Sequence, residues 1–335
     1  MNATIGVIGA GAWGTALAQM LSGDGHQVRL WARDAALADT INRTRANPAY
    51  LPGIALSDAI RATADPADLA GLGVVLAVTP AQALGAVLAQ MPAFAGDLVL
   101  CAKGIEAGTG RLMADVARAA QPHAQIAVLS GPTFAHEVAA GLPTAVTLAC
   151  DQGLAQWRRL APAIARPGFR PYYSVDLVGA EIGGAVKNVL AVACGVVEGL
   201  RLGQNARAAL ISRGHAEMVR FGLAFGAAAD TLSGLSGLGD LVLTCNSLSS
   251  RNFVLGKALG EGASAADLLA DRRTVAEGAF TAPVVSELAR TRGIAMPIAD
   301  AVAALVSGRI PVRAMVDGLL ARPLRSELDA TMWGD

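Results

Sequence analysis

The feature that most constrains the fold of this chain is a glycine-rich run near its N-terminus. The run Gly9-Ala-Gly11-Ala-Trp13-Gly14 follows the apolar stretch Thr4–Ile8 and opens a helical pattern. In a GxGxxG run the first glycine permits a tight turn, the second lets backbone amides approach a pyrophosphate, and the third allows close helix–strand packing. The helix N-terminus also favours negative charge. The sequence therefore predicts a dinucleotide-binding strand–turn–helix, with a purely structural glycine turn as the alternative.

The first half of the chain alternates short β-rich runs with helical patterns. Several runs are continuously apolar, as expected when helices cover both faces of a parallel sheet. The predicted strands are Thr4–Ile8, Gln27–Trp31, Val74–Val78, Leu98–Ala102, Ile126–Leu129 and Ala145–Ala149. Turn residues follow them, among them Gly9, Gly11, Gly25, Thr79-Pro80, Gly104 and Gly131-Pro132. Because open α/β sheets bind ligands at the carboxyl ends of their strands, these turns are predicted to form the rim of the site.

The pattern changes after about Asp176, where apolar residues recur at helical spacing. Helices are predicted in Val178–Leu200, Ala206–Ala227, Phe253–Gly260, Ser264–Leu269, Ala282–Arg292 and Ile298–Val306, with a flexible or tightly turning loop at Gly234–Gly239. We predict an α/β fold in which an N-terminal Rossmann-type doubly wound sheet precedes an all-α C-terminal substrate domain. The predicted division is a dinucleotide-binding domain in residues 1–176 and a helical substrate and catalytic domain in residues 177–335, with a cleft between them.

Composition and charge exclude several classes of function. The formal net charge is zero, which gives no bulk electrostatic support for a nucleic-acid or anionic-membrane surface. No uninterrupted apolar run reaches about 18 residues and no basic leader precedes the first apolar run, so neither a membrane span nor export is expected. The cysteines (Cys101, Cys150, Cys194 and Cys245) are far apart and the histidines are not clustered. This pattern predicts reduced thiols, no metal site and a cytoplasmic, soluble protein.

The second predicted strand is followed by two charged residues that bear on the choice of dinucleotide. Arg33 lies 19 residues after Gly14, where an acidic residue would normally meet the ribose hydroxyls of NAD. An arginine there suits a 2′-phosphate and favours NADPH, whereas the adjacent Asp34 could serve NADH. Two solvated loop charges are the alternative. Tyr50 is interpreted either as a contact of the adenine or nicotinamide or as an ordinary loop aromatic.

Two later strands also end in residues suited to a ligand. Lys103 ends the strand of LVLCAKG, so its ammonium is expected at the carboxyl edge of the sheet. In LSGPTFAHEV the chain turns at Gly131-Pro132, Thr133 supplies a hydroxyl, and the next helix begins with free amides. We expect His136 to be a helix-surface residue.

The helical half contains a second group of polar residues. Asp240 follows the glycine-rich segment, and Ser250, Arg251 and Asn252 stand together at a predicted helix start. A guanidinium is a forked donor suited to phosphate, and hydroxyls and helix-start amides would complete such a pocket. The same residues have the composition of a helix N-cap, so both interpretations are open from this run alone.

Lys187 and Asn188 interrupt the apolar stretch GAEIGGAVKNVLAVACGVVEGL, which spans Gly179–Leu200. A buried ammonium is costly unless it is paired or has lost its proton. A lysine at a solvated helix surface, by contrast, needs no explanation. The stretch alone does not distinguish a catalytic amine from a lysine that reaches solvent along its stem.

Taken together, these motifs resemble those of the bacterial NAD(P)-dependent glycerol-3-phosphate dehydrogenases. The resemblance covers nearly the whole chain: GAGAWGTALA, CAKGIE, SGPTFAHEV, KNVLAVACGVVEGL, ALISRGHAEM, GLGDLVLTC, SRNF and VAEG occur in family order. It implies reduction of dihydroxyacetone phosphate to sn-glycerol 3-phosphate, which feeds phospholipid synthesis. The cofactor is then NADPH or NADH, with NADPH favoured. With the apolar composition, the resemblance also leads us to expect a homodimer.

The resemblance assigns roles residue by residue, with Lys187 as the catalytic proton carrier. Thr133 stands where serine is common and keeps the hydroxyl. With the residues identified above, the predicted substrate-binding set is Lys103, Gly131, Thr133, Lys187, Asp240, Ser250, Arg251 and Asn252. The predicted cofactor-binding set is Gly9, Gly11, Ala12, Trp13, Gly14, Arg33, Tyr50, Lys103, Ala135, Arg251, Val275 and Glu277.

Ketone reduction needs a hydride donor, a proton donor and a group that stabilises charge on the carbonyl oxygen. Burial would lower the pKa of Lys187 and bring the neutral amine within reach near pH 7. We expect Asp240 to orient the ammonium and Lys103 to lie on the opposite side of the substrate. Arg251 and Asn252 are expected to hold the phosphate. The alternatives are a β-hydroxyacid dehydrogenase acting on a carboxylate substrate and a redox sensor that binds a dinucleotide without turnover.

Overall fold

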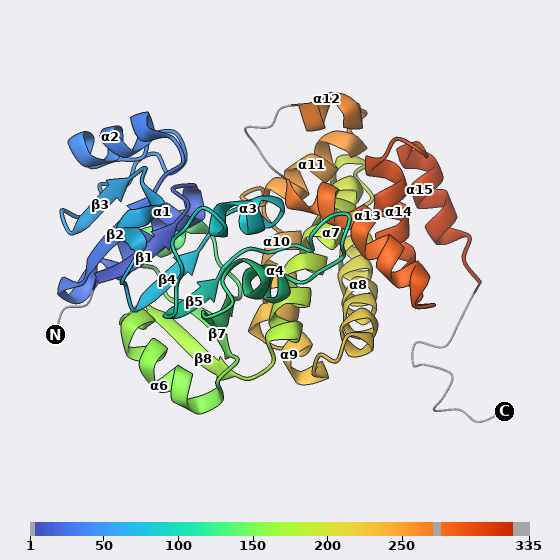
Figure 1. The fold of residues 1–335 in the computed structure, drawn as a ribbon. Helices are drawn as coiled ribbons and strands as arrows, with labels where there is room; N and C mark the ends of the chain where they lie inside the picture. Colours follow the sequence, from blue (N-terminus) through green and yellow to red (C-terminus); the bar gives the residue numbers. More distant parts are fainter. Residues whose placement is uncertain (1–3, 271–275, 324–335) are drawn as a thin grey trace.

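The computed structural model describes residues 4–270 and 276–323. Its first half forms one sheet of eight strands in the order β3-β2-β1-β4-β5-β6-β7-β8 (Figure 1). The strands are β1 (Thr4–Ile8), β2 (Gln27–Trp31), β3 (Ile60–Thr63), β4 (Val74–Ala77), β5 (Asp97–Leu100), β6 (Gln125–Ser130), β7 (Thr144–Cys150) and β8 (Phe169–Ser174). Because the strand order reverses at β1, the glycine run that follows β1 lies at the switch point of a doubly wound sheet.

Neighbouring strands are parallel except at one position. β7 pairs antiparallel with β6, while β8 runs parallel to β7. The strand predicted at Ala145–Ala149 is therefore present within β7, and it is antiparallel to β6 in an otherwise parallel sheet. The connection after β6 contains only the short helix α5 (Ala135–Ala139), which packs against α1 (Ala12–Leu21) at the carboxyl edge. The chain re-enters the sheet from that edge because no helix carries it back to the starting edge.

Two strands at the sheet edges were not predicted. β3 reads IRAT and β8 reads FRPYYS, so both carry arginine, and β8 also carries proline. Charged residues and proline are typical of edge strands, where they discourage pairing with another chain. Neither strand therefore has the continuous apolar run that marks the interior strands.

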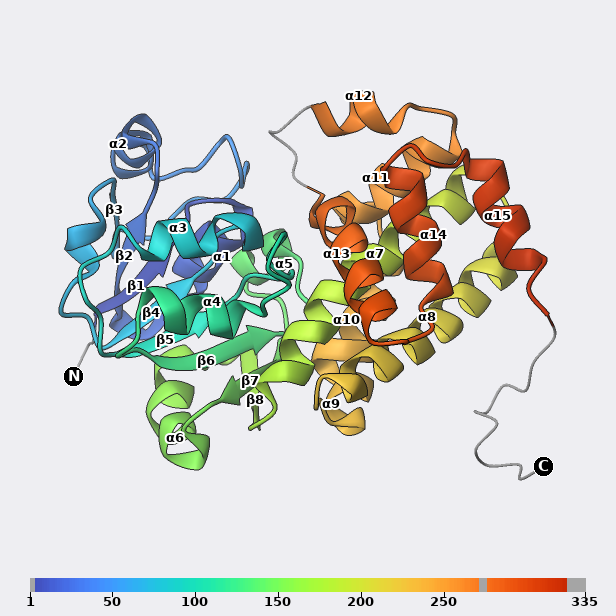
Figure 2. The same cartoon turned by 45° about the vertical axis from the view of Figure 1, so that its right-hand side comes forward.

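Helices cover both faces of the sheet (Figure 2). An apolar core lies on each face. One is formed by β-strand residues with α1, α2 (Ala35–Thr44), α5 and α6 (Gly153–Ile164). The other includes α3 (Leu84–Leu88), α4 (Met113–Ala120) and the first turns of α7 (Leu177–Gly199). The two-sided cover explains why the interior strands are apolar at almost every position.

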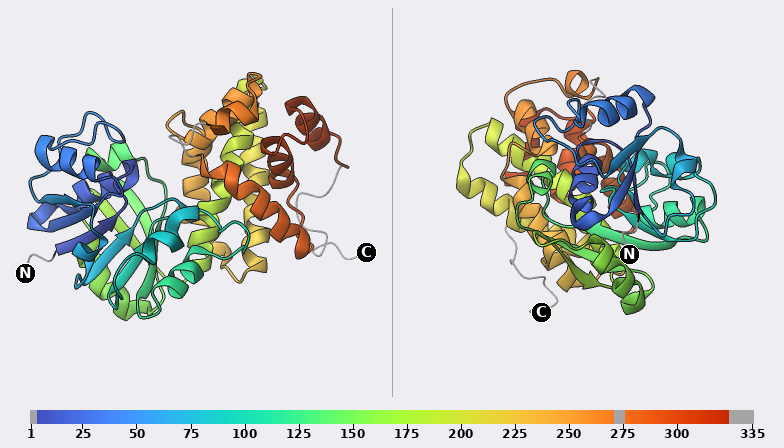
Figure 3. Two further views of the ribbon diagram at one scale, coloured as in Figure 1. Left: turned by 45° about the horizontal axis from the view of Figure 1, so that its top comes forward. Right: turned by 90° about the vertical axis from the view of Figure 1, so that its left-hand side faces the viewer.

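The second half of the chain is a bundle of helices packed around α7 (Figures 1 and 3). It contains α8 (Gln204–Ala224), α9 (Ala229–Ser233), α10 (Asp240–Cys245), α11 (Arg251–Gly260), α12 (Ala265–Ala270), α13 (Glu277–Thr291), α14 (Pro297–Val306) and α15 (Val312–Leu320). Among the described residues only α7 is long and apolar enough to cross a membrane, and 94% of its most apolar window is buried inside the protein. That burial is the expected property of a core helix.

The glycines of α7 allow neighbouring segments to approach its backbone. A Cβ on Gly195 would lie 2.1 Å from the carbonyl oxygen of Phe253, and a Cβ on Gly256 of α11 would lie 1.9 Å from that of Val192. Helices α7 and α11 therefore cross with their backbones in contact. This close crossing brings the N-terminus of α11, with Arg251, towards the middle of α7.

The segment Gly234–Gly239, predicted as a flexible or tightly turning loop, is instead a π-helical turn, η4 (Leu235–Gly239), which leads directly into α10. A Cβ on Gly237 would lie 1.8 Å from the oxygen of Leu232, and a Cβ on Gly183 of α7 would lie 2.3 Å from the oxygen of Ser236. Gly237 therefore allows close packing of η4 against α9, and Gly183 allows close packing of η4 against α7. The prediction was wrong because sequence alone does not distinguish a glycine needed for space from one needed for flexibility.

Candidate active site

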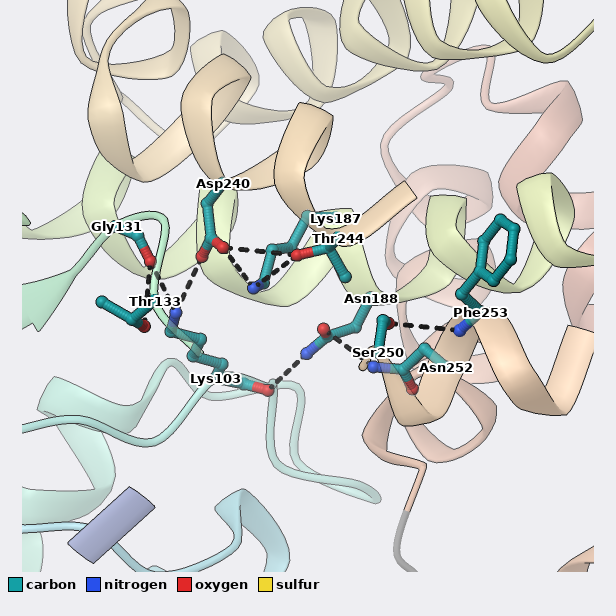
Figure 4. A network of polar contacts seen from close by, with 10 residues as sticks. All are labelled: Lys103, Gly131, Thr133, Lys187, Asn188, Asp240, Thr244, Ser250, Asn252 and Phe253. Atoms are coloured by element: carbon teal, nitrogen blue, oxygen red, sulfur yellow. Dashed lines mark hydrogen bonds and ion pairs between the residues drawn. The ribbon is translucent and has the colours of Figure 1, made fainter. Parts of the chain in front are cut away.

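Lys187 lies in the middle of α7 with only 6% of its surface exposed. Its Nζ lies 2.5 Å from Oδ1 of Asp240 and donates to Oγ1 of Thr244 at 2.9 Å (Figure 4). Asp240 and Thr244 are one turn apart on α10, and both are buried. The lysine that interrupts the apolar stretch therefore does not reach solvent along its stem. It is a buried ammonium with two oxygen partners.

The surroundings of Lys187 act on its proton affinity in opposite directions. Burial is the largest effect and lowers the pKa of Lys187 to about 8, assisted by the nearby charge of Lys103. The carboxylate of Asp240 acts the other way, since it stabilises the ammonium. The amine is thus charged at neutral pH and loses its proton within about one unit above it. That property suits a group that both donates and accepts a proton.

Lys103 follows β5 and reaches the same carboxylate from the sheet domain. Its Nζ donates to Oδ2 of Asp240 at 2.7 Å and to the carbonyl oxygen of Gly131 at 3.1 Å. Thr133 donates to that carbonyl from Oγ1 at 3.3 Å. The sequence expectation placed Lys103 and Lys187 on opposite sides of a substrate. That arrangement stays a prediction, and the structure brings both ammonium groups onto the two oxygens of one buried carboxylate.

A chain of amide hydrogen bonds connects the segments that carry the predicted site residues. Nδ2 of Asn188 donates to the backbone oxygen of Lys103 at 3.4 Å, and Nδ2 of Asn252 donates to Oδ1 of Asn188 at 2.9 Å (Figure 4). The backbone amide of Gly278 then donates to Oδ1 of Asn252 at 2.8 Å. Since these residues adjoin Lys187, Arg251 and Glu277 along the chain, the amide chain fixes the relative positions of four segments.

Two residues of this site were not in the predicted set, namely Asn188 and Thr244. Asn188 was noticed only as a polar residue beside Lys187, and its buried position is the signal that it needs partners. Thr244 lies four residues after Asp240 in GDLVLTC, so it shares a helix face with Asp240. That spacing could have identified it.

The N-terminus of α11 has a helix N-cap and also an exposed arginine that is suited to a phosphate. Oγ of Ser250 accepts from the amide of Phe253 at 3.2 Å, so Ser250 is the N-cap. Arg251 is the first residue of the helix and is exposed, whereas Asn252 is buried in the amide chain. The cap does not exclude a ligand role, because the hydroxyl of Ser250 retains its own donor. The exposed guanidinium is the group of this run that is free to meet a phosphate.

The glycine loop after β1 has the geometry that a dinucleotide requires. A Cβ on Gly14 would lie 1.8 Å from the oxygen of Gly9, and a Cβ on Gly9 would lie 2.9 Å from the oxygen of Val78. By contrast, apart from atoms adjacent along the chain, no described atom lies within 4 Å of the place a Cβ would take on Gly11. Nε1 of Trp13 is buried and has no hydrogen-bond partner among the described residues. The loop is therefore tightly packed below and open above Gly11, which fits a pyrophosphate approaching the amides.

The other predicted cofactor residues of the first half of the chain lie on loops and helix starts. Arg33 is exposed after β2, while Oδ1 of Asp34 accepts from the amide of Ala36 at 2.9 Å as the N-cap of α2. Both residues are exposed, and the second carboxylate oxygen of Asp34 keeps its lone pairs, so the cap does not decide between Arg33 and Asp34 as the contact of the ribose. Tyr50 is half exposed, and Ala135 begins α5. Ala12 follows the N-cap of α1, directly after Gly11.

Glu277 connects the two halves of the chain. Its Oε1 accepts from the backbone amide of Ala81 at 3.1 Å, so the start of α13 is tied to the turn after β4. Val275, the other predicted residue of VAEG, lies outside the described residues. His136 is exposed on α5 with its ring stacked on Phe134, as expected for a surface residue.

Comparisons with known proteins agree along the whole chain. The family model described as NAD-dependent glycerol-3-phosphate dehydrogenase N-terminus matches residues 4–155, and the corresponding C-terminus model matches residues 176–317. The chain is 70% identical to glycerol-3-phosphate dehydrogenase (NAD(P)+) of Novosphingobium aromaticivorans, over 98% of this chain and 99% of that protein. The protein of the same name from Erythrobacter litoralis is 64% identical, over 98% of each chain. The crystal structure of glycerol-3-phosphate dehydrogenase from Coxiella burnetii is 38% identical, with a TM-score of 0.90 over 96% of this chain and 99% of that chain.

Proposed function

Because this chain belongs to the NAD-dependent glycerol-3-phosphate dehydrogenase family, we propose that it reduces dihydroxyacetone phosphate reversibly to sn-glycerol 3-phosphate with NADPH or NADH. It is an NAD(P)-dependent oxidoreductase whose product supplies phospholipid synthesis. The observation that carries the mechanism is the position of the Lys187 ammonium, buried on α7 and bonded to Asp240 and Thr244. A buried amine with a pKa of about 8 is suited to exchange a proton with a carbonyl oxygen.

Lys187 is the proton carrier in this proposal. In the reductive direction its Nζ, as an ammonium, donates a proton to the carbonyl oxygen of the substrate. In the oxidative direction the neutral amine accepts the proton from the hydroxyl. Asp240 keeps the amine charged near neutral pH and holds it in place, and Thr244 accepts one of its hydrogens. The bound nicotinamide supplies the hydride.

Positive charge and a phosphate anchor complete the proposed substrate site. Lys103, on the same carboxylate as Lys187, stabilises negative charge that develops on the carbonyl oxygen. Arg251, exposed at the N-terminus of α11, binds the phosphate with the hydroxyl of Ser250 and the helix amides. Gly131, Thr133 and Asn252 shape the space between these charges. A fixed phosphate orients the ketone for reaction.

The dinucleotide is held by the glycine loop and by residues around it. Gly9, Gly11 and Gly14 would let the backbone approach the pyrophosphate, and Ala12 and Trp13, at the start of α1, would lie beside it. NADPH is favoured over NADH, because the exposed guanidinium of Arg33 suits a 2′-phosphate. Tyr50, Ala135, Val275 and Glu277 complete the cofactor contacts. We also propose a cytoplasmic homodimer, with residues 1–176 as the dinucleotide domain and residues 177–335 as the substrate domain.

An absorbance assay tests this function directly. Purified protein is given NADPH or NADH in parallel with dihydroxyacetone phosphate, with unphosphorylated dihydroxyacetone and with a β-keto acid. We expect oxidation of the dinucleotide with dihydroxyacetone phosphate, faster with NADPH, and little with the other two substrates. Turnover of the carboxylate substrate instead would identify a β-hydroxyacid dehydrogenase. Binding of a dinucleotide without turnover of any ketone would identify a redox sensor.

A further inference from the structure

Asn47 is a fully buried asparagine between the glycine loop and the loop that carries Tyr50. Its Nδ2 donates to the carbonyl oxygen of Ala10 at 2.9 Å and to Oγ1 of Thr15 at 2.8 Å. Its Oδ1 accepts from the backbone amide of Tyr50 at 3.2 Å. One side chain therefore contacts the middle of the glycine run, the first helix after it, and a loop more than thirty residues further along the chain.

We infer that Asn47 is a positioning residue for the dinucleotide, which orients the glycine loop and ties the Tyr50 loop to it. Asn47 acts through its neighbours, and its role rests on the proposed dinucleotide site. The inference combines three hydrogen bonds of one buried amide with the open space above Gly11.

The bond to Ala10 determines where the next amide points. In a trans peptide the carbonyl and the following N–H point in opposite directions. Because Asn47 holds the carbonyl oxygen of Ala10 on its own side, the N–H of Gly11 points to the other side of the peptide. A rotation of this peptide would turn a carbonyl dipole towards a bound pyrophosphate in place of an N–H, so fixing it favours an anion at the loop.

Thr15 is a threonine inside a helix, where this residue type has low helix propensity. Threonine is a poor helix former, and here it is fully buried in α1. Its hydroxyl is the second acceptor for Asn47, and its backbone amide donates to the oxygen of Gly11 at 2.9 Å. Thr15 thus holds the peptides on both sides of Gly11, one directly and one through Asn47.

The hydrogen bond from the amide of Tyr50 to Asn47 also fixes the position of a second segment, the turn that carries Tyr50. The backbone oxygen of Asn47 also accepts from the amides of Tyr50 and Leu51, at 3.4 and 2.8 Å. The half-exposed ring of Tyr50 therefore stands on a turn whose base is attached to the glycine loop. Loss of the Asn47 amide is expected to release both segments together.

The test compares Asn47→Asp with a matched asparagine in the same domain. Aspartate has the same shape, but it cannot donate to Ala10, whose carbonyl would face a second oxygen. Asn42 provides the control, because its side chain makes two bonds of 2.9 Å to the backbone of Ala62 and none to the glycine loop. Dissociation constants of NADPH are measured without substrate, from the fluorescence of the reduced dinucleotide, together with melting temperatures.

We expect Asn47→Asp to raise the dissociation constant of NADPH by about tenfold or more, and Asn42→Asp to change it by less than about twofold. The KM for dihydroxyacetone phosphate at saturating NADPH should stay within about twofold of wild type, since substrate groups on α7 and α11 are untouched. A folded Asn47→Asp protein that binds NADPH as tightly as wild type would overturn the inference. So would equal weakening by the two variants.

A second pair of variants covers the case in which Asn47→Asp does not fold. Thr15→Val removes one acceptor of Asn47, and Thr15→Ser restores it. The valine variant should bind NADPH about threefold or more weakly, while the serine variant should bind within about twofold of wild type. Equal binding by the two would overturn the inference. Absence of NADPH binding by the wild-type protein would instead contradict the proposed function.

Discussion

Lys187 and Asp240 form a buried ion pair between α7 and α10, with 2.5 Å between Nζ and Oδ1. Asp240 is completely buried, and its second oxygen is bonded to Lys103 from the sheet domain. One carboxylate therefore holds two ammonium groups from the two halves of the chain. Burial of charges is costly unless each has partners. The arrangement places an amine of lowered pKa where the two domains meet.

The first prediction concerns pH. Because burial lowers the pKa of Lys187 to about 8, the ammonium needed for ketone reduction is lost as the pH rises through that value. The value of kcat/KM for dihydroxyacetone phosphate should therefore fall above pH 8. The value for oxidation of sn-glycerol 3-phosphate needs the neutral amine and should rise over the same range. Steady-state assays in both directions between about pH 6 and 10 provide the measurement.

The variant Asp240→Asn tests whether the pKa of Lys187 causes this pH dependence. Asp240 raises the pKa of Lys187 against burial, so its loss should move the transition to lower pH. Profiles that stay flat between about pH 7 and 9 in both directions would assign the proton transfer to another group.

The second prediction concerns Arg251, exposed at the N-terminus of α11. Arg251→Ala should raise the KM for dihydroxyacetone phosphate and lower kcat/KM by about tenfold or more, since a charged hydrogen bond to phosphate is lost. The same variant should change little with unphosphorylated dihydroxyacetone, already a poor substrate. Equal losses on both ketones would indicate a structural or cofactor role, and the dissociation constant of NADPH would distinguish these two.

The third prediction concerns cofactor choice. Arg33→Asp places a carboxylate where the 2′-phosphate of NADPH is expected, so repulsion should reduce the use of NADPH more than the use of NADH. The ratio of the two kcat/KM values should change by about tenfold or more, or about 1.4 kcal/mol. Asp34→Asn is the matched control, because asparagine keeps the N-cap of α2 and removes only the charge. An unchanged ratio in Arg33→Asp would make Arg33 a solvated loop charge.

The fourth prediction concerns stability. Glu181 on α7 is buried against the sheet domain, where its Oε1 accepts from the amide of Ala114 at 2.7 Å. Burial raises the pKa of Glu181 from 4.5 to about 8. Between these values the folded state binds more protons than the unfolded state, so the free energy of unfolding should fall as the pH rises. The expected loss is on the order of 1 kcal/mol per pH unit in this window.

Glu181→Gln should reduce that slope, because glutamine keeps an acceptor for Ala114 and does not titrate. The slope should not vanish, since burial also raises the pKa of Glu217 to about 7. Glu198→Gln, an exposed change near the end of the same helix, is the control and should leave the slope unchanged. Denaturant unfolding between about pH 5 and 9 gives the slopes. Equal slopes for wild type and Glu181→Gln would contradict the account.

Much of the fold could be predicted from the sequence where one local rule decides the structure. The strands Thr4–Ile8 and Gln27–Trp31 have the predicted bounds, and α7 begins and ends within one residue of its prediction. The antiparallel direction of β7 could not be predicted, because an apolar strand has the same composition in either direction. The edge strands β3 and β8 were missed because polar and exposed residues interrupt their apolar runs.

The residues of the candidate site could be predicted from the sequence better than the hydrogen bonds and ion pairs between them. Lys187 and Asp240 were both expected from the resemblance, and each occupies a buried position on its helix. The contact of Asp240 with the Lys187 ammonium was expected, and the structure has it at 2.5 Å. The sharing of Asp240 with Lys103 was not predicted, because it depends on contacts between the two halves of the chain. The role of Asn47 could not be predicted either. Its three partners are separated from Asn47 by up to thirty-seven positions, and no spacing in the sequence indicates them.

The most direct test of the account is Lys187→Met. Methionine keeps the apolar stem in the core of α7 and removes the amine, while Asp240 remains paired with Lys103. Turnover of dihydroxyacetone phosphate with NADPH should fall by about 10²–10⁴-fold, as for loss of a general acid. Binding of NADPH, measured on the same preparation, should stay within about twofold of wild type. A variant that retains more than half of wild-type turnover would contradict the assignment of Lys187 as the proton carrier.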